Sequence, residues 1–152
     1  MAFNVKGTLE AVLSHVNSSA HVDMAQIGDY SQPPLTESIA ASIQMTSMAT
    51  NLIFGDGGTR ETHTIQLRLL KPWLNQPSIE TEQSLAIAAA DILSNLEGDA
   101  DAEGTVMSLD VAGMEGASVT IRWGHIVINQ TAYRVAEMAL PFIVDDSATV
   151  TA

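Results

Sequence analysis

The residues best suited to chemistry in this sequence lie in one acidic loop. Oxygen-bearing side chains occupy the first, third, fifth and twelfth positions of the loop, with glycine at the sixth. They are Asp99, Asp101, Glu103 and Asp110, and the carbonyl of Thr105 at the seventh position completes the set. Calcium takes about six to eight oxygen ligands, and an EF-hand loop presents them at this spacing around a sharp turn at glycine. A calcium-dependent binding module is therefore one hypothesis for the function.

The surroundings of this loop favour a simpler interpretation. The fifth position holds Glu103 instead of Asp or Asn, and the twelfth holds Asp110 instead of the longer Glu that binds calcium through both oxygens. Gly113 and Gly116 follow, and glycine opposes the exiting helix that the motif requires. We favour a solvated acidic loop between a helix and a strand over a calcium site. We expect no metal and no cofactor.

Other candidate motifs give no support for catalysis. The run Gly55–Thr59 lacks the lysine of a phosphate-binding P-loop and precedes a strand, so it predicts a hairpin connection. No G-x-S-x-G motif is present, and the absence of cysteine excludes thiolate zinc sites, disulfides and cysteine nucleophiles. The histidines have no metal-ligand spacing; they are His15, His21, His63 and His125. The sequence predicts a protein that is not an enzyme.

The charge of the chain limits its partners. Six basic residues against eighteen acidic ones give a net charge of −12, which disfavours binding to nucleic acid or to an anionic membrane. Nine of the acidic residues lie in residues 72–121, where there is no Lys or Arg. The basic residues on or beside predicted strands are Arg68, Lys71, Arg122 and Arg134. This separation predicts an electrostatically two-sided molecule that suits head-to-tail association.

Nothing in the sequence indicates export or membrane insertion. The amino terminus lacks the charged and apolar regions of a signal or transit peptide. No apolar run approaches the roughly 18 residues of a membrane span. We therefore expect a protein without a membrane partner.

Two helices can be predicted from apolar stripes. Leu9, Val12, Leu13 and Val16 share one face of a short helix that Thr8 can cap and that ends at Ser18 and Ser19. A second helix has Ser78 as its N-cap, Glu80 and Glu82 near the positive end of its dipole, and Gly98 as its terminator. Its apolar stripe comprises Leu85, Ala88, Ala89, Ile92, Leu93 and Leu96.

The remaining chain alternates with the period of strands. Strands are predicted at residues 22–27, 39–46, 64–69, 105–112, 119–123, 126–128 and 133–144, with a loop at Pro33-Pro34 and a turn at Asn129-Gln130. Pro72 closes the third of these strands, and Pro141 predicts an edge position or a bulge in the last. The order predicts one α+β domain over residues 1–146, with two helices packed against an antiparallel or mixed sheet, and a flexible tail at 147–152.

Four segments between Thr62 and Asp146 resemble a known family. They are "THTIQLRLLKP", "SIETEQSLAIAAADILSNLEG", "TVMSLDVAG" and "IRWGHIVINQTAYRVAEMALPFIVDD". Together they are similar to the tail terminator proteins of long-tailed, siphovirus-like phages, and more loosely to tail-completion and neck proteins. The likeness covers about three-fifths of the chain, through architecture and a few residues. The predicted first helix lies where the amino-terminal helix of that family lies.

This resemblance implies a structural virion protein assembled in the host cytoplasm. It implies a ring of identical subunits, usually a hexamer, that caps the finished tail tube, stops its polymerisation and joins it to the neck. A head-tail connector or tail-completion role is the alternative within the same class. The expected partners are other copies of the chain, the tail tube protein and neck proteins, while DNA passes through the lumen without specific binding. The residues predicted to contact neighbouring subunits or the tube are Gly55, Asp56, Gly57, Gly58, Thr59, Arg60, Arg122, Arg134, Asp145 and Asp146.

Overall fold

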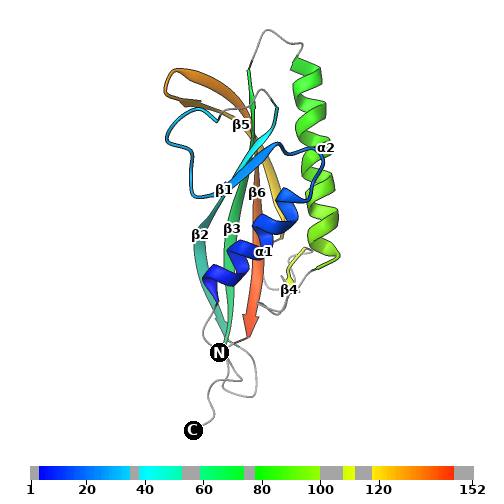
Figure 1. Cartoon of the computed structure of the whole chain (residues 1–152). Helices are drawn as coiled ribbons and strands as arrows, with labels where there is room; N and C mark the ends of the chain where they lie inside the picture. The colour runs from blue at the N-terminus through cyan, green and yellow to red at the C-terminus, as the bar shows by residue number, and fades with distance from the viewer. Residues whose placement is uncertain are drawn as a thin grey trace.

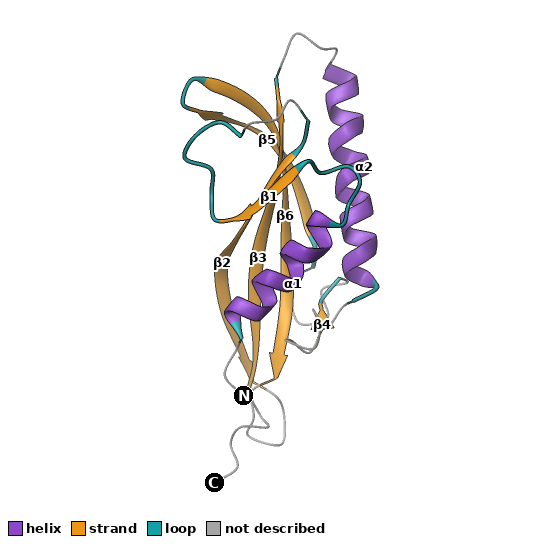
Figure 2. Cartoon of the chain, in the orientation of Figure 1, coloured by secondary structure: helices purple, strands orange, loops and turns teal. Residues whose placement is uncertain are grey.

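A computed structural model describes residues 4–34, 38–52, 59–73, 78–99, 108–111 and 118–145. Within them the chain forms two helices on one face of a six-stranded sheet, which confirms the predicted α+β fold (Figures 1 and 2). The helices are α1 (Val5–Asn17) and α2 (Ser78–Glu97). The strands are β1 (Met24–Ile27), β2 (Ala40–Leu52), β3 (Thr59–Pro72), β4 (Ser108–Leu109), β5 (Thr120–Ile128) and β6 (Thr131–Asp145).

The sheet is built around the pairing of β3 with β6. Its strand order is β1-β2-β3-β6-β4, and β5 pairs with the part of β6 that β4 leaves uncovered. All pairs are antiparallel except β1 with β2, which makes the sheet mixed. The β3–β6 ladder runs from Arg60 opposite Asp145 to Pro72 opposite Tyr133, so these two strands are the centre of the sheet.

The helix-covered face of the sheet carries the main core. Alternating apolar residues of β3 point to this face, and Leu67 lies opposite Met138 of β6. Helix α1 packs on β1 and β2, while α2 packs on β3 and β6. The largest fully buried side chains of this core are Ile43, Ile65, Leu67, Leu69, Leu85, Ile92, Leu96, Met138, Leu140 and Phe142. Burial of each such side chain contributes roughly 1.5–3 kcal/mol.

The start of α1 differs from the prediction. The helix begins at Val5, and the side chain of Asn4 caps it by accepting a hydrogen bond from the backbone nitrogen of Gly7 at 3.0 Å. Thr8, predicted to be the cap, lies inside the helix, where its hydroxyl donates to the carbonyl of Asn4 at 2.8 Å. The side chain of Asn4 accepts a hydrogen bond from a backbone N–H at the helix start as well as threonine would. With Asn4 as the cap, the helix begins one turn earlier than predicted.

The other predicted helix ends agree more closely with the structure. Helix α1 ends at Asn17, directly before the predicted stop at Ser18. Helix α2 begins at Ser78 itself, the residue predicted to cap it, and ends at Glu97 before Gly98.

The predicted edge position of Pro141 is wrong, because β6 lies in the middle of the sheet. Pro141 pairs with Thr64 of β3 on one side. On the other side its carbonyl accepts a hydrogen bond from the backbone nitrogen of Asp110 at 2.8 Å. The nitrogen and oxygen of one strand residue face the same neighbour, so the missing N–H faces β4 and β5. The ladder of β5 stops at Ala139 and that of β4 at Phe142, so this proline falls in a break between two short partners.

The last two strands form a tight hairpin, as predicted. Asn129 and Gln130 both have positive φ angles, 45° and 70°, which is the backbone of the two-residue turn that matches strand twist. The strands predicted separately at 119–123 and 126–128 are one strand, β5, that includes Gly124. Of the strand predicted at 105–112, residues 108–111 are described, and only Ser108–Leu109 of these form a strand, β4. Residues 147–152 lie outside the described chain.

No helix in the described ranges is both long and apolar enough to cross a bilayer.

Substitution in α2 should separate core packing from helix propensity. Ile92 is 0% exposed, whereas Ile87 on the outer side of the same helix is 53% exposed. Ile92→Ala should lower the free energy of unfolding by about 2–5 kcal/mol, because it removes buried methyl groups and leaves a cavity. Ile87→Ala should change it by less than about 1 kcal/mol. Urea unfolding followed by circular dichroism measures both, and equal losses would contradict the packing described.

A glycine in the hairpin turn should stabilise the protein. Gln130→Gly removes the strain of a left-handed backbone, about 1–2 kcal/mol, against a glycine entropy cost of about 0.5–1 kcal/mol. The expected gain is up to about 1.5 kcal/mol in the same unfolding measurement. Thr131→Gly, one residue into β6, is the control and should be destabilising.

Candidate functional site

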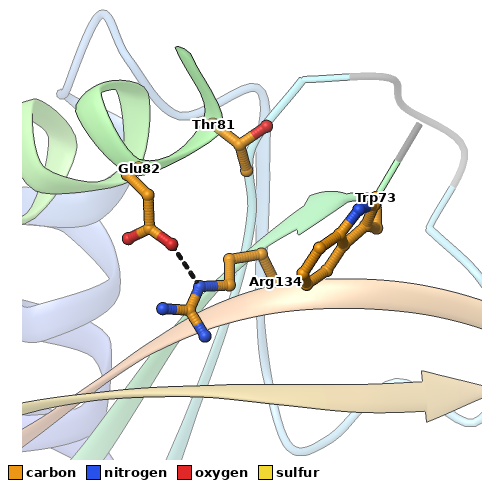
Figure 3. Close-up of a pocket in the computed structure, with 4 residues that line it drawn as sticks. All are labelled: Trp73, Thr81, Glu82 and Arg134. Carbon is orange, nitrogen blue, oxygen red and sulfur yellow. Dashed lines mark hydrogen bonds and ion pairs between the residues drawn. The ribbon is translucent and has the colours of Figure 1, made fainter. Parts of the chain in front are cut away.

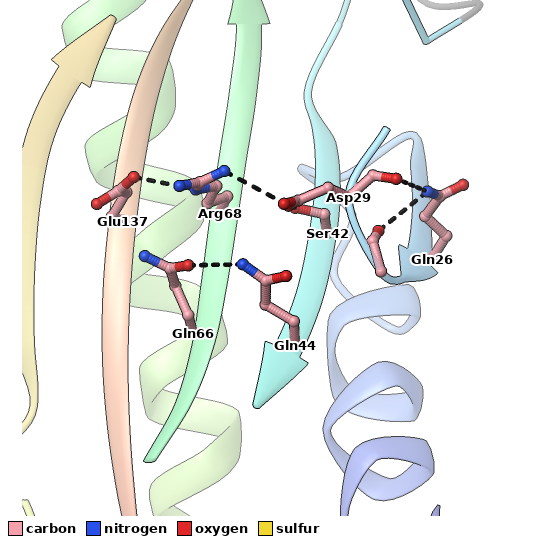
Figure 4. Close-up of polar contacts among 8 residues, drawn as sticks. Gln26, Asp29, Ser42, Gln44, Gln66, Arg68 and Glu137 are labelled. Atoms are coloured by element: carbon pink, nitrogen blue, oxygen red, sulfur yellow. Dashed lines mark hydrogen bonds and ion pairs between the residues drawn. The ribbon is translucent and has the colours of Figure 1, made fainter. Parts of the chain in front are cut away.

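The face of the sheet away from the helices carries a polar network (Figure 4). The amide of Gln44 on β2 donates to the side-chain oxygen of Gln66 on β3 at 3.0 Å. Beside them Arg68 donates from its Nε to Glu137 of β6 at 3.0 Å, and its other nitrogen lies 3.4 Å from Asp29, in the loop after β1. These side chains come from positions that alternate with the core residues, so the sheet itself aligns them on one surface.

The charges on this face compensate one another. Arg122 of β5 lies opposite Glu137 in the strand register, at the distance of cross-strand neighbours. With Arg68 and Asp29, this network therefore sets two guanidinium groups against two carboxylates. A phosphate backbone approaching this face would meet no excess of positive charge, which is the main source of nonspecific affinity for DNA.

One end of the same face is covered by a second apolar cluster. Leu70, Tyr133 and Val135 are buried there beneath Tyr30, which lies in the loop after β1. The hydroxyl of Tyr30 donates to the carbonyl of Ala41 at 3.1 Å and holds this loop against β2. Burial raises the pKa of both Tyr30 and Tyr133 above 10.0. The loop therefore leaves the polar network as the open part of the face.

On the helix-covered face, Arg134 of β6 joins the start of α2 to β5. Its Nε donates to Glu82 at 2.6 Å, and another nitrogen donates to the carbonyl of Gly124 at 3.3 Å. The guanidinium lies 6.0 Å from the ring centre of Trp123, within cation–π range.

The hollow beside Arg134 is too small for an ordinary ligand site. It has a volume of about 10 Å³ and is lined by Trp73, Thr81, Glu82 and Arg134 (Figure 3). Sites for small molecules usually enclose about 300–1,000 Å³. Both tryptophans beside it, Trp73 and Trp123, are nearly half exposed. Exposed tryptophan next to a fixed arginine is a composition that protein interfaces favour.

Two edges of the sheet are open among the described residues. Strand β5 pairs only with β6, so its outer edge has no strand partner there. On the opposite side of the sheet, β1 pairs with residues 40–43 of β2, and the outer side of the rest of β2 has no strand partner in the described chain. Unpaired N–H and C=O groups along such edges are templates for another strand.

The calcium hypothesis gains no support from the described residues. Asp101, Glu103 and Thr105 lie outside them. The carboxylate of Asp99 lies 2.7 Å from Nε2 of His15, a contact that joins the ends of α2 and α1. Asp110 is buried beside β6. No group of three or more potential metal-binding side chains occurs in the described ranges.

The residues predicted to contact neighbours are dispersed. Gly55 to Gly58 and Asp146 lie outside the described chain. Thr59 and Arg60 begin β3, and Arg60 lies opposite Asp145 in the register with β6. The other two lie on different faces, Arg122 on the polar one and Arg134 on the helix-covered one.

The predicted separation into a basic and an acidic side is wrong. Lys71 donates to Ser84 at 2.9 Å, and Arg134 pairs with Glu82, so two of the four basic residues lie against the acidic helix α2. The polar network was missed in the sequence, although the alternation of Gln66 and Arg68 with buried leucines was the signal for it.

Comparison of the chain with protein families and with curated proteins finds no match.

The two tyrosines provide a direct probe of the apolar cluster. The chain contains two tyrosines, and burial raises the pKa of each, so the midpoint of tyrosinate formation in the native protein should lie above 10.0. A raised folded-state pKa contributes stability that is complete below the unfolded pKa and lost as pH rises through the folded one. Stability should therefore fall above pH 10.0. Ultraviolet titration of native, urea-unfolded and Tyr30→Phe protein measures this. Equal midpoints in the native and unfolded states would contradict the burial of both rings.

Proposed function

We propose that this protein is a ring-forming structural subunit of a phage virion, resembling a tail terminator that caps the tail tube and joins it to the neck. The observation that carries the proposal is the sheet with one helix-covered face and one polar, charge-compensated face. In a ring with the helices outside, the polar face lines the channel. Neck or tail-completion rings need the same arrangement and remain the alternative.

The charges of the polar face suit a channel through which DNA moves. Arg68 is held by Glu137 and Asp29, so it is compensated before any phosphate arrives. The chain as a whole carries −12, and a ring of such subunits multiplies that charge. DNA in such a channel would be repelled at long range and would find no strong contact at short range.

The two open edges suit a closed ring. The outer edge of β5 and the uncovered part of β2 are different surfaces on opposite sides of one sheet. Contact between two different surfaces is heterologous, and repeated heterologous contact closes into a ring when the rotation permits.

The state of assembly tests the proposal first. Purified protein should form a species of several times the 16.1 kDa subunit mass, and averaged electron micrographs should show a ring with a central hole. The ring should not retard duplex DNA at low salt. A monomer at all concentrations, or tight DNA binding, would overturn the proposal.

Single cysteines test which face lines the channel, since the natural chain has none. Gln66→Cys places a thiol on the polar face, and Ser94→Cys places one on the exposed side of α2. A small maleimide should label both variants. A long polyethylene-glycol maleimide should label position 66 several-fold more slowly than position 94, after each rate is divided by its rate with the small reagent. Equal ratios would contradict the inward orientation.

Capping is tested with the tube protein of the same phage. Rings should bind one end of preformed tubes and shorten tubes that grow in their presence. Binding along the tube wall, or no binding, would overturn the terminator role.

A further inference from the structure

We infer that the outer edge of β5 in one copy of the chain binds the uncovered part of β2 in a second copy, head to tail. This inference rests on the proposed ring and names its subunit contact. The uncovered part of β2, residues 44–52, is called the distal segment below.

The two edges match in length. Strand β5 has nine residues. Strand β2 has thirteen, of which four pair with β1, so nine remain in the distal segment. Figure 1 shows β1 crossing only the part of β2 nearer to the β5–β6 hairpin. Neither edge carries a proline, and the distal segment has no charged residue, so two common features that protect an edge from pairing are missing there. The register of β2 with β3 shifts between Met45 and Ser47, near one end of the distal segment, and is regular from Ser47 to Leu52.

Both edges also avoid the charge that would keep two copies apart. The chain has eighteen acidic residues, yet neither β5 nor the distal segment contains one. Strand β5 carries Arg122 and His125, and the distal segment is neutral. Copies with a net charge of −12 repel one another, so contact costs least where no carboxylate is brought close to another.

The helix layer explains what a second copy would cover. Helices α1 and α2 pack on β1, β2, β3 and β6, and no residue of β5 is fully buried. Ile121, Trp123 and Val127 of β5 therefore expose apolar surface on the helix side of the sheet. Val127 is 68% exposed and Met48 of the distal segment is 59% exposed, which are large fractions for apolar side chains.

Pairing of the two edges would bring α1 of the second copy toward this apolar strip. Helix α1 packs on β2, and Val5 at its start is also exposed. Each strand adds about 4.8 Å to the width of a sheet, whereas neighbouring helices pack about 8–10 Å apart, so one helix covers about two strands. The uncovered surface of β5 would then lie between α2 of its own copy and α1 of the next copy. The second copy thus completes a helix layer that one subunit leaves short.

Strand direction and side-chain parity restrict the pairing. Within one subunit β5 runs antiparallel to β2, because three antiparallel pairings separate them. A ring preserves these directions, so β5 would pair antiparallel with the next distal segment. Met48 points to the helix side, as do Trp123 and His125, whereas Gly124 points to the other side. Residues that lie directly opposite each other point to the same face of a sheet, and a shift of one residue reverses the face of every side chain. When the middles of the two segments are aligned, Met48 therefore lies opposite Trp123 or His125.

The two edges are offset along the strand direction, so the strands of a closed ring must be inclined to the ring axis. Through the registers, the middle of β5 is level with Leu70 and the middle of the distal segment with His63. The offset of seven residues between Leu70 and His63 corresponds to roughly 23 Å along the strands. One subunit with its contact spans four strand spacings, which is roughly 19 Å across the strands. A ring without axial rise then needs strands inclined by roughly 50° to its axis, slightly more than the typical 35–45° of closed barrels.

Two edge variants and their mixture test this contact. Val127→Asp blocks β5 and Met48→Asp blocks the distal segment, and both positions are exposed, so the subunit should still fold. Each variant alone should be monomeric, with association weakened at least about tenfold by a buried charge. An equimolar mixture should form dimers of the two variants and nothing larger, because one intact edge pair remains. Mass photometry counts the species, and circular dichroism confirms folding.

The matched control is Ile87→Asp, which adds the same charge at an exposed isoleucine on the side of α2 that faces His21 and Lys71. It should assemble like the natural chain. Rings formed by either edge variant alone, or a mixture that stays monomeric, would overturn this inference and leave the ring itself standing. A natural chain that is monomeric at all concentrations would overturn the ring and the contact together.

Discussion

The pairing of β3 with β6 is the interaction on which the rest of the structure depends. It joins Arg60–Pro72 to Tyr133–Asp145 without a break in register. Every other strand except β1 attaches to one of these two, β2 to β3, and β4 and β5 to β6. Helix α2 packs on both, so the core is built on this ladder. Because the two strands are far apart in sequence, closing the ladder costs loop entropy that the buried apolar residues must offset.

The ladder also determines how chemistry is divided between the two faces. Along β3, Ile65, Leu67 and Leu69 point to the helices, so Gln66 and Arg68 must point away from them. The same alternation on β6 buries Met138 and presents Glu137 beside Arg68. A shift of one residue between the strands would exchange the core for the polar network, so the two surfaces specify one another.

The sequence predicts best what depends on local pattern. The stripe of α2, the alternation of β3 and the turn at Asn129-Gln130 each follow from neighbouring residues, and each is present. Predictions failed where partners distant in the sequence decide. Pro141 was expected at an edge or a bulge because a central strand normally needs its N–H. The edge position is wrong, and only the ends of the β4 and β5 ladders reveal the break that this proline occupies.

The candidate site follows the same division. The residue types of the polar face could be predicted from alternation, but the pairing of Arg68 with Asp29 depends on the loop after β1, which no short-range pattern places. Similarly, the acidic run in residues 72–121 suggested separate acidic and basic sides, yet Arg134 and Lys71 reach α2 from the strands beneath it. The distribution of charge along the sequence therefore does not predict its distribution on the folded surface, because basic residues of the strands reach the acidic helix that packs on them.

The same charge bears on the proposed assembly. A chain at −12 gains no general attraction for its own copies, so electrostatics opposes a ring and the contacts must come from hydrogen bonds and apolar burial. A strand edge supplies both, since its backbone groups pair regardless of side-chain charge and its side chains can exclude water. The acid-free segments lie along the two open edges, while the carboxylates of the polar face are held by arginines. In the proposed assembly, acidity elsewhere on the surface would disfavour other contacts between copies and would favour the closed ring over disordered aggregation.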